Sequence, residues 1–378
     1  MKFTINRSVF ANQLNNVLRA ISSKTTIPIL TGVKIVVEDQ QVILTGSNAD
    51  ITIQTTLSVE NGKNALTVEE PGAIVLPARF FSEIIKKLPD QDVTIEVHDG
   101  FQAKISSGTA EFQINGQDAN NYPHLPEIQS ASTIAVAADL LRDVVEQTRI
   151  AVSKQESRPI LTGIHMRLAD DQLVAVATDS HRLAQRKVTV PTNGQSYDVV
   201  IPGNSMTELA RMIADVKGEI QIQIAENQVL FQFDNALFYS RLLEGMYPET
   251  SRLIPDTADT TIELEAGNFL AAIDRASLLS HQGHNNVVKL SLDPDTNTAK
   301  ISGDSADVGN VEEDVNFEKL TGDKLEISFN PDYMSDALKS FGQASVLLSF
   351  TSPLRPFTLV PTEDQENFVQ LITPVRTF

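Results

Sequence analysis

The stretch T-D-S-H-R-L at residues 178–183 holds the residue types best suited to chemistry. Asp179 and His181 are two residues apart, so on a β-strand both side chains would project from one face as a general-base pair. A hydrolase built around this pair is the enzymatic hypothesis. The alternative is structural, because an Asp at the end of a strand can cap backbone N–H groups. Spacing alone favours capping, so the stretch does not by itself require an enzyme.

Other clusters of reactive side chains point away from catalysis and metal binding. His281 and His284 are three residues apart but lack a carboxylate at a metal-ligand spacing. Asp170 and Asp171 fit a hairpin turn, and the acidic run 312–314 fits an exposed, like-charged loop. The chain has no glycine-rich phosphate loop and no G-x-S-x-G motif. We therefore expect no catalytic residue, no metal and no cofactor.

The composition narrows the class of protein. The chain has 378 residues, a formal net charge of −19 and no cysteine, which excludes disulfides and thiolate chemistry. This acidity argues against DNA binding over the whole surface but allows one basic face, and the first acidic residue is Glu38. Because the chain has no long apolar run and no secretory signal at Met1, we expect a cytoplasmic protein with no membrane partner.

Internal repetition divides the chain into three copies. The string P-I-L-T-G at 28–32 recurs unchanged at 159–163, each time before an alternating apolar run. A second internal similarity relates T-G-S-N-A-D at 45–50 to S-G-D-S-A-D at 302–307. The corresponding segment of the middle copy is V-A-T-D-S-H at 176–181. Three copies in the same order, about 126 residues apart, indicate three similar domains.

Each copy shows the same order of expected elements: a helix, strands, a second helix and further strands. Apolar residues recur every third or fourth position in the helices and every second position in the strands. The expected helices are 8–21, 79–88, 138–152, 205–214, 267–279 and 331–341. Strands joined by hairpin turns predict antiparallel sheets. The fold class is therefore α+β: three similar domains at 1–126, 127–253 and 254–378, each a duplicated helix-plus-strands unit, with linkers at 121–132 and 248–259.

Three motifs together resemble one known family. They are R-P-I-L-T-G at 158–163, A-T-D-S-H-R-L-A at 177–184 and P-V-R at 374–376. This combination is similar to the bacterial DNA polymerase III β subunit family, the replicative sliding clamps, over the whole chain. The resemblance implies a head-to-tail dimeric ring of three clamp domains per chain, with helices inside and sheets outside. Such a ring encircles duplex DNA without sequence specificity, tethers a polymerase and catalyses nothing itself.

Simple arithmetic agrees with a dimer rather than a monomer. Six helices packed side by side at about 10 Å enclose a clear hole of only about 9 Å. That hole is too small for duplex DNA, whose major groove alone is about 12 Å wide. Twelve helices, from two chains, enclose a hole of about 28 Å. Two copies are therefore expected to surround DNA.

The lining of the ring is expected to attract phosphates weakly and without reading bases. Arg142 and Arg149 are seven residues apart on an expected helix, as are Arg79 and Lys86, so each pair shares a face. By resemblance, the DNA-facing residues also include Lys24, Gln155 and Arg158. For each of these residues, an ordinary surface position is the alternative.

The resemblance also implies a hydrophobic pocket between the middle and last domains that accepts short peptides from partners. Its partners would be the DNA polymerase III catalytic subunit, the clamp loader and other replication and repair proteins with a clamp-binding motif. The pocket residues carried over are Leu161, Thr178, Ser180, His181, Arg182, Leu183, Pro248, Arg252, Leu253, Asn330, Tyr333, Leu371, Ile372, Thr373, Pro374, Val375 and Arg376. Asp179 and His181 would then be part of the pocket scaffold.

For the homodimer seam, the resemblance points to Phe112 and Ile114 of one chain against Leu278 and Leu279 of the other. Buried core positions are the alternative for all four residues. A third hypothesis for the whole chain is a β-rich scaffold that binds proteins but never DNA.

Overall fold

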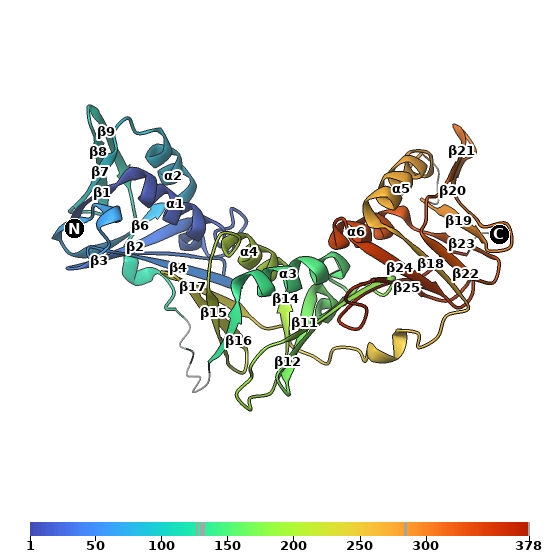
Figure 1. Cartoon of the computed structure of the whole chain (residues 1–378). Helices are drawn as coiled ribbons and strands as arrows, with labels where there is room; N and C mark the ends of the chain where they lie inside the picture. Colours follow the sequence, from blue (N-terminus) through green and yellow to red (C-terminus); the bar gives the residue numbers. More distant parts are fainter. Residues whose placement is uncertain (126–127, 129–132, 283–285, 377–378) are drawn as a thin grey trace. The chain divides into compact units, whose positions relative to one another are not determined.

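The computed structural model describes residues 1–125, 128, 133–282 and 286–376. His284, considered above as a metal ligand, lies outside these residues, as does part of the expected linker 121–132. The chain forms two compact units (Figure 1): unit 1 is Met1–Asp139 with Arg211–Leu242, and unit 2 is Leu140–Ala210 with Leu243–Phe378. The described helices are all too short or too polar to cross a lipid bilayer.

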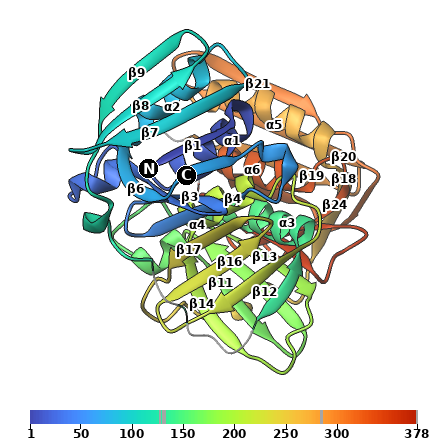
Figure 2. The same ribbon diagram turned by 90° about the vertical axis from the view of Figure 1, so that its left-hand side faces the viewer.

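Unit 1 contains two antiparallel sheets. Figure 2 shows β7, β8 and β9 of its five-stranded sheet side by side. This sheet consists, in order, of β5 (Thr67–Glu70), β1 (Lys2–Asn6), β7 (Asp92–His98), β8 (Gln102–Ser107) and β9 (Ala110–Asn115). The eight-stranded sheet consists of β10 (Ile134–Ala137), β15 (Glu219–Ile224), β16 (Gln228–Phe233), β17 (Ala236–Arg241), β4 (Ile51–Ser58), β3 (Gln41–Ser47), β2 (Gly32–Glu38) and β6 (Gly72–Pro77). Strands of the first and middle copies thus share one sheet, through the β17–β4 ladder.

The helices of unit 1 are α1 (Arg7–Leu18) and α2 (Ala78–Lys87), which pack against each other. The Asn6 side chain caps α1 by accepting hydrogen bonds from the first N–H groups of the helix. Phe10 of α1 lies edge-on to Phe3 and to Phe81 of α2, with ring centroids 6.0 and 5.9 Å apart. All three rings are fully buried, so the hydrophobic face of each helix forms the core. Short 3-10 turns occupy η1 (Pro28–Thr31), η2 (Gly62–Asn64) and η3 (Ala119–Asn121).

Unit 2 also contains two antiparallel sheets. The nine-stranded sheet consists, in order, of β14 (Tyr197–Pro202), β11 (Gly163–Ala169), β12 (Gln172–Thr178), β13 (Arg182–Thr189), β26 (Phe368–Ile372), β25 (Phe357–Pro361), β24 (Ser345–Phe350), β18 (Thr260–Glu265) and β22 (Lys319–Gly322). The four-stranded sheet consists of β21 (Gly309–Asp314), β20 (Thr298–Ser305), β19 (Val288–Asp293) and β23 (Leu325–Phe329). The β13–β26 ladder joins the middle and last copies and brings the end of the chain beside β13.

The helices α5 (Ala266–Ser280) and α6 (Pro331–Phe341) of unit 2 pack against each other, and α5 also packs on β20. Phe269 of α5 and Met334 of α6 belong to one buried core together with Phe329, Phe350 and Phe357. Two more helices, α3 (Ala138–Thr148) and α4 (Gly203–Met212), begin or end at the unit boundary. The 3-10 turns are η4 (Arg149–Ala151), η5 (Pro159–Thr162) and η6 (Ser251–Leu253).

The expected six α-helices and antiparallel strands are confirmed among the described residues, but each copy begins with a strand, β1, β10 or β18, before its first helix. Asp170 and Asp171 form the β11–β12 hairpin turn, where both have positive φ. Three further expectations were wrong. The helix expected at 8–21 ends at Leu18. The helix expected at 138–152 ends at Thr148, because residues 149–151 form η4. The acidic run 312–314 is part of strand β21 rather than a loop, because Lys300 pairs with Glu312 and Arg275 with Glu313.

Candidate functional site

The turn between β12 and β13 positions the residues that first suggested chemistry. Asp179 and His181 lie in this turn and not on a strand, so the shared-face argument for a general-base pair was wrong. One oxygen of Asp179 accepts hydrogen bonds from the backbone N–H of His181 at 2.9 Å and of Arg182 at 3.0 Å. The Asp179 carboxylate therefore caps the turn and also binds the Arg182 guanidinium, which agrees with the capping alternative.

Two further side chains fix the shape of this turn. The Thr178 hydroxyl donates to the carbonyl of Arg182 at 2.7 Å and accepts from the N–H of Ser180 at 3.1 Å. Ser180 has a φ of 77°, a left-handed conformation that is uncommon for a residue other than glycine. The turn is thus held by its own hydrogen bonds, and it presents Ser180 and His181 to solvent.

Arg182 ties the turn to helix α6. Its Nε contacts Asp179 Oδ2 at 3.1 Å and its Nη1 contacts Asp336 Oδ2 at 2.7 Å. The guanidinium also lies 4.5 Å from the ring centroid of Tyr333, a cation–π geometry. His181 stacks on the same ring at 6.3 Å. Burial, helped by the charge of Asp179, raises the pKa of Tyr333, so this phenol stays neutral.

The tail after β26 contacts both the turn between β12 and β13 and the strand β23. The N–H of Thr373 donates to the carbonyl of His181 at 2.9 Å, and the N–H of Val375 donates to the carbonyl of Ser328 at 2.7 Å. The structure therefore brings the turn 178–183, the tail 371–376 and the start of α6 together. Asn330 caps α6 by accepting the N–H of Asp332 at 2.8 Å.

The apolar residues predicted for the pocket fall into two groups. Leu161, Leu183, Leu371 and Ile372 are buried, and Leu183 and Leu371 pack together with Val176. Leu253 and Val375 are exposed, at 50% and 36% of their surface. The buried group belongs to the core of the chain, whereas Leu253 and Val375 leave apolar surface exposed to solvent. The predicted Arg252 and Leu253 lie on η6, and Pro248 precedes it in the linker.

Sequence reasoning missed two residues of this site. Asp336 binds Arg182 from 154 positions further along the chain, and no local pattern indicates such a pairing. Tyr247 accepts a hydrogen bond from the N–H of Thr178. In the sequence, only its position next to the predicted pocket residue Pro248 pointed to it. Both contacts follow from the β13–β26 ladder and the path of the linker, which a local motif does not encode.

The residues predicted to face DNA lie on separate elements. Arg79 and Lys86 both lie on the exposed face of α2. Arg142 on α3 pairs with Asp143, and Arg149 pairs with Glu146. Because Arg149 starts η4, the seven-residue face argument does not extend to it. Lys24, Gln155 and Arg158 lie in exposed loops, and Arg158 donates to the Ser180 hydroxyl at 3.0 Å, which places it beside the turn.

The predicted seam residues differ in exposure. Phe112 on β9 is 39% exposed and Leu278 on α5 is 67% exposed, whereas Leu279 is half-buried. Ile114 is only 8% exposed and so belongs mainly to the core of its own chain. Phe80 on α2, which the sequence did not single out, is also exposed, at 59%.

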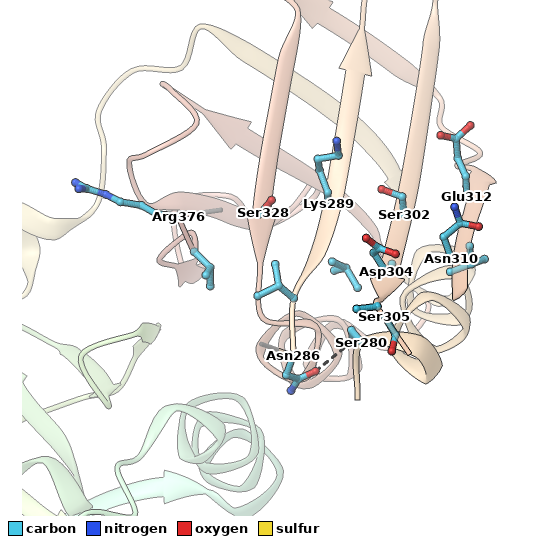
Figure 3. Close-up of a pocket in the computed structure, with 16 residues that line it drawn as sticks. Ser280, Asn286, Lys289, Ser302, Asp304, Ser305, Asn310, Glu312, Ser328 and Arg376 are labelled. Carbon is cyan, nitrogen blue, oxygen red and sulfur yellow. Dashed lines mark hydrogen bonds between the residues drawn. The ribbon is translucent and has the colours of Figure 1, made fainter. Parts of the chain in front are cut away.

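A hollow of about 990 Å³ lies beside the tail, at one end of the four-stranded sheet (Figure 3). Its lining combines Lys289 and Arg376 with Asp304 and Glu312, so no single ligand charge is favoured. Val375 and Arg376 form part of its wall, which places the hollow next to the candidate peptide site. Within the described part of the chain, no three His, Asp or Glu side chains are arranged to hold a metal.

Comparisons with known proteins give one consistent result. Models of the N-terminal, central and C-terminal domains of the DNA polymerase III beta subunit match residues 1–126, 135–249 and 251–376. The beta sliding clamp of Bacillus subtilis is 49% identical over 381 residues, and that of Staphylococcus aureus is 43% identical over 379 residues. Both alignments cover 100% of this chain and of the relative.

Solved structures agree with the sequence comparison. The crystal structure of the Bacillus subtilis DNA polymerase sliding clamp matches with a TM-score of 0.96 at 49% identity. The DNA polymerase III beta chain of Streptococcus pneumoniae matches with a TM-score of 0.96 at 41% identity. Each match covers 100% of both chains. The chain therefore belongs to the DNA polymerase III beta subunit family, and its role is that of a DNA sliding clamp, a non-catalytic processivity factor of replication.

Proposed function

We propose that two copies of this chain close head to tail into a ring around duplex DNA, each copy contributing three domains at residues 1–126, 127–253 and 254–378. The six described α-helices per chain support a ring of two copies. Six helices alone would leave a hole of about 9 Å, whereas twelve would leave a hole of about 28 Å. The ring holds DNA by topology, so its contacts with phosphate can stay weak enough for sliding. We propose that it acts in the cytoplasm.

The proposed seam joins β9 of one copy to the region of α5 and β21 of the other. Both β9 and β21 are edge strands of their sheets, and an open edge is a ready site for pairing with another chain. The exposed side chains of Phe112 and Leu278 supply apolar surface, and the half-buried Leu279 adds to it. Because the two surfaces differ, the contact is heterologous, and two such contacts close a ring.

Inside the proposed ring, basic side chains and one glutamine would meet the phosphates without reading bases. The residues proposed for this role are Lys24, Arg79, Lys86, Arg142, Arg149, Gln155 and Arg158. Contacts of this kind are sequence-independent and weaken as salt concentration rises. The net charge of −19 supports a single favourable location for DNA, because an acidic exterior repels it elsewhere.

The proposed peptide pocket is formed by the turn 178–183, the tail 371–376, η6 and the start of α6. The observation that carries it is the turn 178–183, which Arg182 fixes to α6 and to which the tail is bonded through the Thr373 N–H. Ile254, the residue after the exposed Leu253, packs against the buried cluster that contains Leu183. Burying one or two Leu or Phe side chains there would give about 1.5–3 kcal/mol each before ordering costs, which suits exchangeable partners. The proposed partners are the DNA polymerase III catalytic subunit, the clamp loader and other replication and repair proteins with a clamp-binding motif.

The test is retention on circular DNA. Labelled chain is loaded onto a nicked plasmid by a clamp loader, free protein is removed by gel filtration, and the plasmid is then cut once. We expect the protein to stay with the circle and to leave after cutting, because a ring slides off a free end. Equal retention before and after cutting would indicate ordinary DNA binding, and no retention at all would favour the protein scaffold.

A further inference from the structure

Tyr247 makes a contact that the proposed pocket residues do not explain. Its phenol oxygen accepts a hydrogen bond from the backbone N–H of Thr178 at 3.0 Å, across 69 positions of sequence. Thr178 is only 7% exposed, so water cannot readily replace this acceptor. Burial raises the pKa of the Tyr247 phenol to about 12, so the group is neutral at any physiological pH.

The ring of Tyr247 is held as firmly as its hydroxyl. It stacks on His165 of β11 with ring centroids 4.8 Å apart and an angle of 23° between the planes. His165 is itself fixed, because its Nε2 lies 2.7 Å from Asp198 Oδ1 on the neighbouring strand β14. The phenol therefore reaches Thr178 from a rigid support on two strands of the nine-stranded sheet.

This contact joins two walls of the proposed pocket. Thr178 begins the turn that carries Ser180 and His181, and its hydroxyl sets the shape of that turn. On the other side, Tyr247 directly precedes Pro248 in the segment that leads to Leu253. The Tyr247 hydroxyl thus connects the segment from Pro248 to Leu253 with the β12–β13 turn.

We propose that Tyr247 is a positioning residue for the peptide pocket: its hydroxyl, through the Thr178 N–H, holds the β12–β13 turn in register with the Pro248–Leu253 segment. This role rests on the proposed peptide-binding function. It requires the hydroxyl and not merely the ring, because the ring only anchors the residue on His165. A ligand that touches both walls binds best when their spacing is fixed beforehand.

The test uses the full-length chain with Tyr247→Phe, which keeps the ring and removes one oxygen. A fluorescein-labelled hexapeptide with adjacent Leu and Phe residues serves as the probe, read by fluorescence anisotropy. We expect its Kd to rise about three- to tenfold, the range for one lost hydrogen bond. Hydrogen exchange followed by mass spectrometry should be faster across residues 177–183. Tyr197→Phe on β14 is the matched control, and it should leave both readouts unchanged.

The outcomes separate this proposal from the function on which it rests. If the unaltered chain does not bind the peptide, the proposed pocket is wrong, and the positioning role is wrong with it. If the unaltered chain binds but Tyr247→Phe binds equally well, only the role of Tyr247 is overturned. A lower melting temperature with an unchanged Kd would likewise overturn it, since that result describes a purely structural contact.

Discussion

At the scale of single residues, Arg182 connects most of the candidate site. It neutralises Asp179, binds Asp336 of α6 and covers the ring of Tyr333. The Arg182 and Asp179 side chains are 12% and 13% exposed, so each depends on the other to compensate for lost hydration. A lysine would not replace this arginine, because only a planar guanidinium can bind two carboxylates and stack on a ring at once.

Replacing Arg182 by alanine should therefore be costly. Arg182→Ala leaves Asp179 largely buried without its cation, and we expect the free energy of unfolding to fall by about 2–3 kcal/mol. Urea denaturation followed by circular dichroism measures this change. Arg142→Ala is the control, because its ion pair with Asp143 is solvent-exposed and should contribute less than about 1 kcal/mol. An equal loss in both variants would contradict the role assigned to Arg182.

At the scale of elements, the repeats share local structure as well as sequence. The P-I-L-T-G strings form the equivalent turns η1 and η5, each followed by a strand that begins at its glycine. Gly46 and Gly303 also correspond, and at each a helix passes directly over the strand. A Cβ at Gly46 would lie 2.3 Å from the Val17 carbonyl oxygen, and one at Gly303 would lie 2.4 Å from that of Ala276.

The middle copy has Ala177 at the corresponding position. The helix there gives way to η4, which packs on β12, so the backbone takes a different path over this alanine. In the first and last copies a helix carbonyl thus leaves no room for a Cβ at this position, whereas the middle copy accommodates one. The glycines are thus required by packing and not by a special backbone conformation, since neither has positive φ.

The close approach of the helix to Gly46 predicts that adding one methyl group there lowers the free energy of unfolding. Gly46→Ala forces α1 away from β3, because the obstructing atom is a backbone oxygen, and we expect a loss of about 2–3 kcal/mol in unfolding free energy. Thermal unfolding by calorimetry checks it. Gly62→Ala is the control, since no atom lies within 4 Å of its added Cβ and its stability should change by no more than about 0.5 kcal/mol. An unchanged melting temperature for Gly46→Ala would show that α1 can move freely.

At the scale of the whole molecule, the proposed dimer depends on a small apolar contact. Leu278 is two-thirds exposed at the surface of α5, and Leu279 is half-buried beside it. This apolar surface lies beside the edge strand β21, and it is what the proposed dimer would bury.

The double variant Leu278→Ala plus Leu279→Ala should yield monomers in analytical ultracentrifugation, with helix content unchanged by circular dichroism. The same protein should be lost from circular DNA, since one chain cannot surround the duplex. Leu354→Ala is the control, because Leu354 is 59% exposed but lies outside the proposed seam. A double variant that still sediments as a dimer would place the seam elsewhere.

The sequence by itself determined the local elements and the family. Periodicity predicted all six α-helices, α6 with its observed bounds, because helix and strand patterns report which face of a short segment is buried. Repetition predicted three similar copies, and three motifs pointed to the sliding clamps. The helices and strands are readable because their patterns are set within a few residues, and the repeats and motifs are readable because they are strings in the sequence itself.

The contacts between distant segments became visible only in the folded chain. It showed that strands of different copies share sheets, that Asp179 caps a turn, and that Ile114 belongs to the core. It also placed 312–314 in a strand, where lysine and arginine from other elements offset the acidic charge. The reason is physical: the partners of Arg182 and Thr178 lie 154 and 69 positions away. Pairings over such separations are fixed by how the strands assemble into sheets, and a local pattern does not record them.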